Sequence, residues 1–304
     1  MRKTFSSLIE KISEDDSILF LTGDLGFNAF ENLRLKMQDR FMNLGVAEQN
    51  MIGVAAGMAH KGFSVFCYSI APFITYRCLE QIRIDVCFHK LPVFIVGNGG
   101  GFGYGIMGPT HHGIADLACM SSLPEMTCYI PAFNEDVEPS LSEMILEKKP
   151  SYLRLGFGKS IPENHNHRND IRCISDPLKA EITVLALGPV IHNAIDAISI
   201  HKLNDMVSLF SAIKIPMKKG LEEFIQNIVR TKKLIIVEEH VKRGGISEYI
   251  ALALLQKNIQ LDKFHSFNAH FEADDLSGNQ SYYQMQSGLD ARNIGNKMLE
   301  WIKR

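Results

Sequence analysis

The chain has 304 residues, of which 46% are hydrophobic and 22% are charged, and its formal net charge is -2. This length and composition predict a soluble globular protein with enough apolar residues to fill the cores of two domains. The nearly balanced charge and the lack of a long Lys/Arg block argue against nucleic acid and anionic membranes as main partners. Because no apolar run has the length of a membrane span or the form of a signal peptide, we expect a cytoplasmic protein with no membrane partner.

The six cysteines are scattered along the chain and never form a C-x-x-C pair. Cysteines that ligate zinc or build a disulfide framework follow characteristic spacings, so neither arrangement is indicated. We expect buried thiols and no metal site within this chain.

Short apolar runs alternate with longer helical patterns in the first half of the chain. This alternation is typical of a parallel sheet covered by helices. The expected strands, in chain order, are 17–22, 40–44, 64–68, 92–96, 127–130 and 151–155. The expected helices are 3–12, 48–61, 76–88, 115–122 and 135–147.

Residues 157–177 are polar and lack periodicity, which indicates a linker. A second α/β block follows, with expected strands at 182–187, 206–210 and 234–238 and expected helices at 192–200, 221–229 and 245–255. The predicted organisation is therefore a first domain at 1–160, a linker at 161–178 and a second domain at 179–304. The predicted fold class is α/β, with two three-layer α/β/α domains.

The stretch "GNGGGFGYGIMGPTHHG", residues 97–113, contains a literal G-x-G-x-x-G after an expected strand. A dinucleotide site needs a helix that starts at the glycines, but Pro109 and the residues around it intervene. A phosphate-binding P-loop needs a Lys-Ser/Thr pair after the glycines, which is absent. The stretch is better interpreted as a flexible loop at the carboxyl end of a strand, where α/β folds bind ligands, and it carries His111 to that face.

The segment "RFMNLGVAEQNMIGVAAGMAHKG", residues 40–62, places Glu48 in the first turn of a helix rich in Ala, Gly, Met and Val. Such a helix is expected to be buried. Its carboxylate either complements the helix dipole or lies in an apolar cleft where it can handle protons. The residues alone leave both interpretations open.

This segment resembles the one that carries the thiamine-activating glutamate in transketolases and 1-deoxyxylulose-5-phosphate synthases. Further stretches match the same family in the same order: "TGDLG" at 22–26, "EQIRIDV" at 80–86, "GPTHHGIADLACMSSLPEMT" at 108–127, "PSYLRLG" at 150–156 and "VEEHVKRGG" at 237–245. The resemblance covers most of the chain. It implies a pyrimidine-binding domain of the thiamine-diphosphate-binding fold, followed by a transketolase C-terminal domain.

The Gly-Asp-Gly…Asn pattern that binds thiamine diphosphate and a divalent metal in full-length transketolases has no match here. The resemblance therefore implies the C-terminal, β-type subunit of a split transketolase. Such a subunit requires a separate N-terminal subunit that holds Mg2+ or another divalent ion, with thiamine diphosphate shared between the two. A homodimer core within an α2β2 heterotetramer is the implied assembly, and a ketol transfer between a ketose donor and an aldose or aldehyde acceptor is the implied reaction.

The resemblance also assigns cofactor-binding residues. Glu48 aligns with the glutamate that hydrogen-bonds the aminopyrimidine ring nitrogen and thereby favours the tautomer that activates the cofactor. Ile70, Phe73 and Tyr76 align with aromatic positions three apart over the pyrimidine, and Phe73 is the expected stacking residue. Ile70 departs from the family pattern because it is not aromatic.

The implied substrate-binding residues are partly altered. His111 aligns with a histidine that faces substrate oxygens, and the cationic Arg2 and Arg154 align with phosphate-contacting arginines. Three positions depart from the family: Asn28 stands in place of Ser, Gly99 in place of His, and Met107 in place of Asp. We therefore expect a substrate that differs from the usual pentose phosphates.

Two alternatives share the same fold. One is the β subunit of a 2-oxo acid dehydrogenase, and the other is a non-catalytic interaction subunit. The stretches around Glu48 and His111 favour the transketolase interpretation. The run Glu238-Glu239-His240 lies at a strand end, and the resemblance favours a structural role for it over a metal site.

Overall fold

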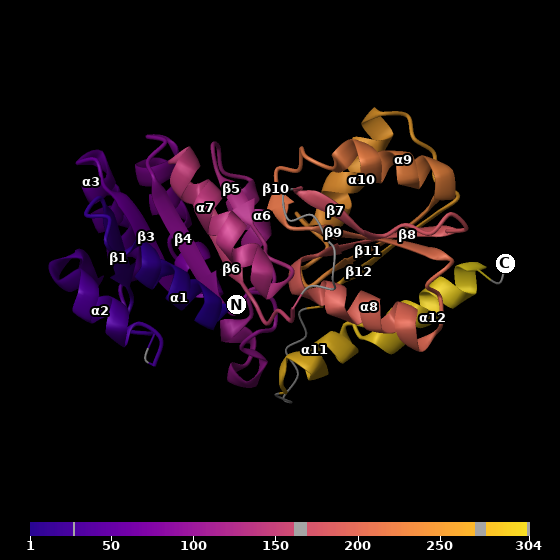
Figure 1. The fold of residues 1–304 in the computed structure, drawn as a ribbon, viewed down its shortest axis with the longest axis horizontal. Coiled ribbons are helices and arrows are strands. Elements are labelled where there is room, and N and C mark those ends of the chain that lie inside the picture. Colours follow the sequence, from indigo (N-terminus) through magenta and orange to yellow (C-terminus); the bar gives the residue numbers. More distant parts are fainter. Residues whose placement is uncertain (27, 161–168, 271–277, 303–304) are drawn as a thin grey trace.

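The computed structural model describes residues 1–26, 28–160, 169–270 and 278–302. It contains two α/β units side by side, each built on one central sheet with helices on both faces (Figure 1). The expected fold class is confirmed. Two expected strands match to the residue, β6 (Ser151–Leu155) and β8 (Ile182–Leu187).

The first sheet has seven strands in the order β10-β5-β6-β4-β3-β1-β2. All neighbouring pairs are parallel except β10 with β5. The carboxyl ends of the parallel strands therefore meet at one edge, which is the position of ligand sites in such folds. The strands are β1 (Ile18–Thr22), β2 (Phe41–Asn43), β3 (Ser64–Ile70), β4 (Val93–Asn98), β5 (Thr127–Tyr129), β6 and β10 (Lys214–Ile215).

Helices cover both faces of this sheet because each has an apolar stripe at helical spacing. In α1, for example, Phe5, Leu8 and Ile9 are buried against one face. That face is covered by α1 (Arg2–Ile12), α2 (Glu31–Met37) and α7 (Val137–Glu147). The other is covered by α3 (Glu48–His60), α4 (Ala71–Thr75), the π-helical turn Ile82–Cys87 and α6 (Asp116–Ser121).

The second sheet has five strands in the order β12-β11-β8-β9-β7, and only the β7–β9 pair is antiparallel. Its strands are β7 (Ile171–Ser175), β8, β9 (Val207–Ala212), β11 (Lys233–Glu238) and β12 (Lys263–Asn268). Its helices are α8 (Ile191–Ile200), α9 (Leu221–Thr231), α10 (Ile246–Gln256), α11 (Gln280–Gln286) and α12 (Ala291–Ile302).

Two expectations from the sequence are wrong. Ile171–Ser175, placed in the linker, forms strand β7, while residues 161–168 of that expected linker lie outside the described residues. The helix expected at 76–88 begins at Leu79, as α5 (Leu79–Gln81), and continues into the π-helical turn, because Tyr76 ends the preceding helix α4.

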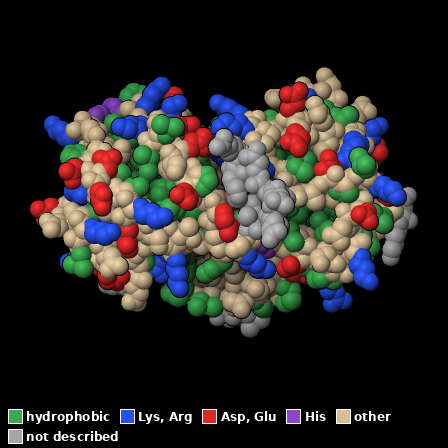
Figure 2. Space-filling model, viewed as in Figure 1, with side chains coloured by type: hydrophobic (Ala, Val, Ile, Leu, Met, Phe, Trp, Pro, Cys, Tyr) green, Lys and Arg blue, Asp and Glu red, His purple; other side chains and the backbone are tan. Residues whose placement is uncertain are grey.

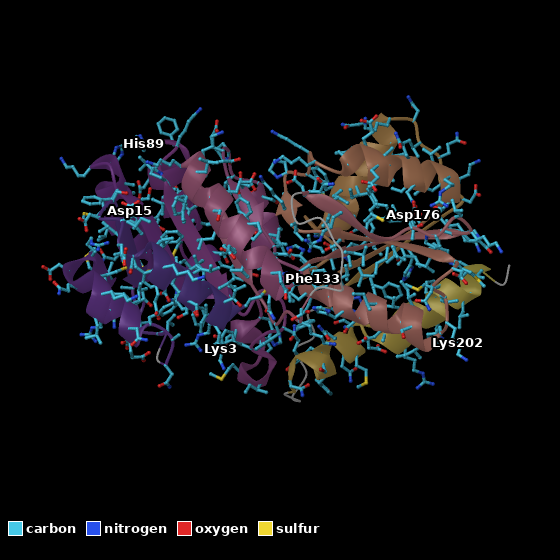
Figure 3. The ribbon with its side chains drawn as sticks, viewed as in Figure 1. Lys3, Asp15, His89, Phe133, Asp176 and Lys202 are labelled. Atoms are coloured by element: carbon cyan, nitrogen blue, oxygen red, sulfur yellow. The ribbon has the colours of Figure 1, made fainter. Side chains whose placement is uncertain are left out.

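The polar appearance of β7 comes from a charged residue that is buried between the domains. Arg172 forms a buried ion pair with Asp136, and its guanidinium lies 5.1 Å from the ring centroid of Phe133. Phe133 is labelled where the two domains meet in Figure 3. A sequence pattern cannot predict such a strand, because the partner that allows the charge to be buried lies in the other domain.

The surface in Figure 2 shows Lys and Arg interspersed with Asp and Glu, with no large area of one sign. Among the helices of the described residues, none is long and apolar enough to cross a bilayer.

Candidate functional site

The carboxylate of Glu48 lies at the carboxyl edge of the first sheet, in the first turn of α3. Its residue is only 1% exposed, so a charge there needs partners. The hydroxyl of Ser69, near the end of β3, donates to Oε1 at 3.0 Å, and Arg77 Nη1 donates to Oε2 at 2.5 Å. The buried carboxylate is thus fixed in orientation from two sides.

Phe73 links this carboxylate to His111. The guanidinium carbon of Arg77 lies 5.0 Å from the Phe73 ring centroid, and the ring of His111 packs edge-on against Phe73 at 5.0 Å. Phe73 lies on α4, directly after β3, while His111 ends a short 3-10 turn, Pro109–His111. The structure therefore brings Glu48, Phe73 and His111 close together through Arg77, while their expected roles in cofactor and substrate binding stay predictions. Ile70 ends β3 and precedes α4.

Tyr76 holds the far end of the His111 loop. Its hydroxyl accepts a hydrogen bond from the backbone N–H of Ala115 at 2.8 Å. Burial raises the pKa of the Tyr76 hydroxyl, so it remains protonated at physiological pH.

The glycine-rich loop is anchored by the second domain. Gly101 and Gly113 exchange backbone hydrogen bonds that close the loop at its base. The Phe102 N–H donates to Glu239 Oε1 at 2.5 Å, and Glu239 is itself held by Gln280 and Gln284 of the second domain. The base of the loop is therefore held in place by its own backbone and by the second domain.

A cavity of about 750 Å³ opens beside this loop. It gathers three of the expected substrate-binding residues, Arg2, Asn28 and Gly99, together with Asn98 and Tyr104. The side chain of Tyr104 also reaches His111, with ring centroids 6.4 Å apart. The cavity and the Glu48 cluster are thus joined through the Tyr104–His111 contact.

Arg154 does not reach this cavity. Its residue is 4% exposed, and its Nε donates to Asp116 Oδ2 at 2.8 Å. Its Nη2 donates to the backbone carbonyls of Gly113 and Glu239. We correct the expectation that Arg154 contacts a substrate phosphate, because these protein groups already occupy the buried guanidinium.

Met107 also lies apart from the cavity. It is 55% exposed on the 3-10 turn Gly105–Met107 and is absent from the cavity lining. The Met107 side chain therefore faces solvent, and its expected role in substrate binding stays a prediction.

The run Glu238-Glu239-His240 is built into the domain contacts. Glu238 accepts hydrogen bonds from Ser247 and from the N–H of Ile246 at the start of α10, and His240 Nε2 accepts from the N–H of Ala118. Across the residues that the structure describes, no cluster of three or more His, Cys, Asp or Glu side chains could hold a metal ion.

The sequence interpretation missed four side chains that shape the site: Ser69, Arg77, Asn98 and Tyr104. Two of them have a local signal, because Arg77 is one helical turn after Phe73 and Asn98 ends the strand before the glycines. Ser69 and Tyr104 have none, since only the fold shows which partners they reach.

Comparison with known proteins identifies the family. The family described as "Transketolase, pyrimidine binding domain" matches residues 1–158, which is more than half of the chain. The chain belongs to the transketolase pyrimidine-binding domain family. Members of the transketolase family use thiamine diphosphate.

Several relatives match this transketolase-family chain over its whole length. An apulose-4-phosphate transketolase subunit from Phocaeicola vulgatus is 26% identical, covering 100% of this chain and 97% of that protein. A putative transketolase C-terminal section from Methanocaldococcus jannaschii is 30% identical, covering 100% and 96%. A 1-deoxy-D-xylulose-5-phosphate synthase from Clostridium perfringens is 27% identical, and the chain spans 48% of it.

Solved transketolase structures share the fold. The structure titled "Split gene transketolase, inactive beta4 tetramer" aligns with a TM-score of 0.81 at 24% identity, covering 99% of this chain and 97% of that one. The transketolase from Leishmania mexicana aligns with a TM-score of 0.80 at 16% identity, and the chain covers 45% of it.

Proposed function

We propose that the chain is the pyrimidine-binding subunit of a split, thiamine-diphosphate-dependent transketolase-like enzyme. It would transfer a two-carbon ketol unit from a ketose donor to an aldose or aldehyde acceptor. The observation that carries the proposal is the fixed, buried carboxylate of Glu48 beside the ring of Phe73, in a chain that aligns end to end with transketolase subunits.

The residues present fit the aminopyrimidine of thiamine diphosphate. A buried carboxyl group can share a proton with a ring nitrogen, donating it as the acid or accepting a hydrogen bond from the protonated ring, and the half-buried Phe73 offers an aromatic face for stacking. When bound, the cofactor supplies a nucleophilic carbon for C–C cleavage and formation. Glu48 orients and polarises the pyrimidine, while Ser69 and Arg77 hold the carboxylate in place.

His111 and the adjacent cavity form the proposed substrate site. An imidazole in contact with Phe73 is placed to hydrogen-bond the oxygen on which charge changes during C–C cleavage. Arg2 and Lys3 provide positive charge in the same cavity, which suits a phosphate group on the substrate. We extend the proposal to ketose phosphates other than xylulose 5-phosphate, such as the apulose 4-phosphate named for two relatives.

A separate diphosphate-binding subunit is part of the proposal. It would hold Mg2+ or another divalent ion and the diphosphate, and two copies of each subunit would assemble around a dimer of this chain. The related structure titled as a beta4 tetramer is described as inactive, which supports the need for a second kind of subunit in that protein. A cytoplasmic location follows from the same proposal.

The alternatives of a 2-oxo acid dehydrogenase subunit and a non-catalytic subunit gain no support. The two relatives named above that match this chain nearly end to end carry transketolase names, and Glu48 keeps a geometry suited to cofactor activation.

Reconstitution with the diphosphate-binding subunit tests the proposal. The neighbouring reading frame that encodes such a subunit would be co-expressed, and the purified complex assayed for thiamine diphosphate binding by calorimetry. Ketol transfer would be measured with xylulose 5-phosphate and apulose 4-phosphate as donors. A complex that binds the cofactor and transfers the two-carbon unit supports the proposal, whereas a complex that forms but binds no cofactor contradicts it.

A further inference from the structure

Tyr104 occupies the space that a side chain at position 99 would need. Gly99 has a φ of +71°, and a Cβ built on it would lie 2.2 Å from Cδ2 and 2.3 Å from Cε2 of Tyr104. No side chain at 99 can coexist with this ring, and the left-handed backbone itself favours glycine. Gly99 and Tyr104 are therefore a matched pair, in which the aromatic ring fills the volume above the glycine.

Asn98 fixes the tyrosine hydroxyl in this position. Asn98 Nδ2 donates to Tyr104 Oη at 2.5 Å. A phenol can donate one hydrogen bond besides those it accepts, and an amide oxygen can accept two. Within the described parts of the chain, the Tyr104 hydroxyl hydrogen has no protein acceptor and Asn98 Oδ1 has no protein donor. Both groups line the cavity, so one donor and one acceptor remain for a ligand.

Tyr104 and Asn98 lie between the two ends of the proposed substrate site. Arg2 and Asn28 line the same cavity as Tyr104, and the Tyr104 ring also contacts the ring of His111. A sugar phosphate with its phosphate near Arg2 and its reacting carbon near His111 would place its middle hydroxyls beside Tyr104 and Asn98. Arg2 and Lys3 both line this cavity, so positive charge lies at its wall.

We propose that Tyr104 is a specificity-determining residue, which donates its hydroxyl hydrogen to a middle oxygen of a polyhydroxylated sugar phosphate while Asn98 accepts from a neighbouring hydroxyl. This inference rests on the proposed function and names the part of the substrate that the cavity recognises. A site that hydrogen-bonds a substrate hydroxyl discriminates against molecules that lack it, because its own polar groups are then left unpaired.

Tyr104→Phe is the direct test, since it removes the hydroxyl and keeps the ring over Gly99. The reconstituted complex is assayed with ribose 5-phosphate, whose middle hydroxyls would lie beside Tyr104 with its phosphate near Arg2, and with glycolaldehyde, which has no carbons beyond the reacting end. Tyr249→Phe is the matched control, because Tyr249 is 40% exposed on α10 in the other domain. Calorimetric binding of ribose 5-phosphate to the complex provides a second readout that does not depend on turnover.

We expect Tyr104→Phe to lower kcat/KM for ribose 5-phosphate about tenfold or more, and to weaken its binding similarly. Its kcat/KM for glycolaldehyde stays within about threefold of the wild type, as do both values for Tyr249→Phe. An equal loss for both acceptors, or no loss for either, overturns the inference while leaving the proposed function intact, and so does a wild-type complex that transfers the ketol unit to glycolaldehyde but neither binds nor uses ribose 5-phosphate. A wild-type complex that binds no cofactor and transfers no ketol unit overturns the proposed function, and the inference with it.

Discussion

Replacing Arg154 by methionine distinguishes a structural arginine from a phosphate-binding one. The Arg154–Asp116 pair is almost fully buried, and the guanidinium also binds the carbonyls of Gly113 and Glu239. Removing one partner of a buried ion pair leaves the other charge uncompensated, which typically costs about 3–5 kcal/mol. Tyr152 still donates to Asp116 at 2.6 Å, so we take the lower end, about 3 kcal/mol.

For a chain of 304 residues, with an unfolding entropy of about 2.1 cal/mol/K per residue, a loss of about 3 kcal/mol corresponds to a fall in Tm of roughly 5 °C. Differential scanning calorimetry of the isolated chain measures it. The control is Arg83→Met, which removes an exposed pair with Glu80 and is expected to leave Tm within about 1 °C. If Arg154→Met kept the wild-type Tm but raised KM for a phosphorylated substrate, the structural assignment of Arg154 would be refuted.

Three further predictions concern the site and its support. Glu48→Gln is expected to lower kcat of the reconstituted complex by at least about 100-fold with little change in Tm, since a neutral amide cannot replace a carboxylate in proton handling; near wild-type turnover would contradict it. Gly99→Ala should lower the free energy of unfolding by about 2–4 kcal/mol, but only by about 1 kcal/mol in a Tyr104→Ala background, where the clash is relieved. Urea unfolding of the wild type, the two single variants and the double variant measures this difference, and additive effects would contradict the clash. Burial lowers the pKa of His192 in the folded chain, where its Nε2 accepts a hydrogen bond from the backbone N–H of Lys159. In the unfolded chain this histidine has its ordinary pKa of about 6.5, so the unfolded chain binds more protons between the two pKa values. Stability should therefore fall as the pH drops from about 6.5 through the lower folded pKa. Unfolding curves of His192→Gln should show a weaker pH dependence in that range, and identical slopes would argue against the burial effect.

The sequence predicts most of the first domain because its elements follow local patterns. Apolar runs such as 151–155 form buried parallel strands, and the apolar stripe of α1 faces the sheet. Glu48 and Phe73 follow expected strands within about five residues, whereas His111 is carried by the glycine-rich loop that begins at the end of the next expected strand. The carboxyl ends of parallel strands meet at one edge, so a position along the chain already implies a position in space.

The remaining features depend on partners that are distant in the sequence. Arg154 looks like a phosphate ligand from its motif, yet Asp116 and two backbone carbonyls occupy its guanidinium. Strand β7 looks polar because Arg172 is buried only through its pairing with Asp136 of the first domain. Neither buried arginine could be predicted from its neighbours in the sequence, because the free energy of burying a charge depends on the group that pairs with it.

The sequence by itself determined the family, the α/β class and the chemical identity of the carboxylate and imidazole at the site. The family follows from the resemblance of its motifs and the α/β class from local periodicity, and folding alters neither the motifs nor the residue types. Only the tertiary structure decided which groups share the cavity, that Arg154 is held by the protein itself, and that Tyr104 fills the space above Gly99. Side-chain contacts between segments far apart in the chain are fixed by packing, and packing exists only once both sheets have formed.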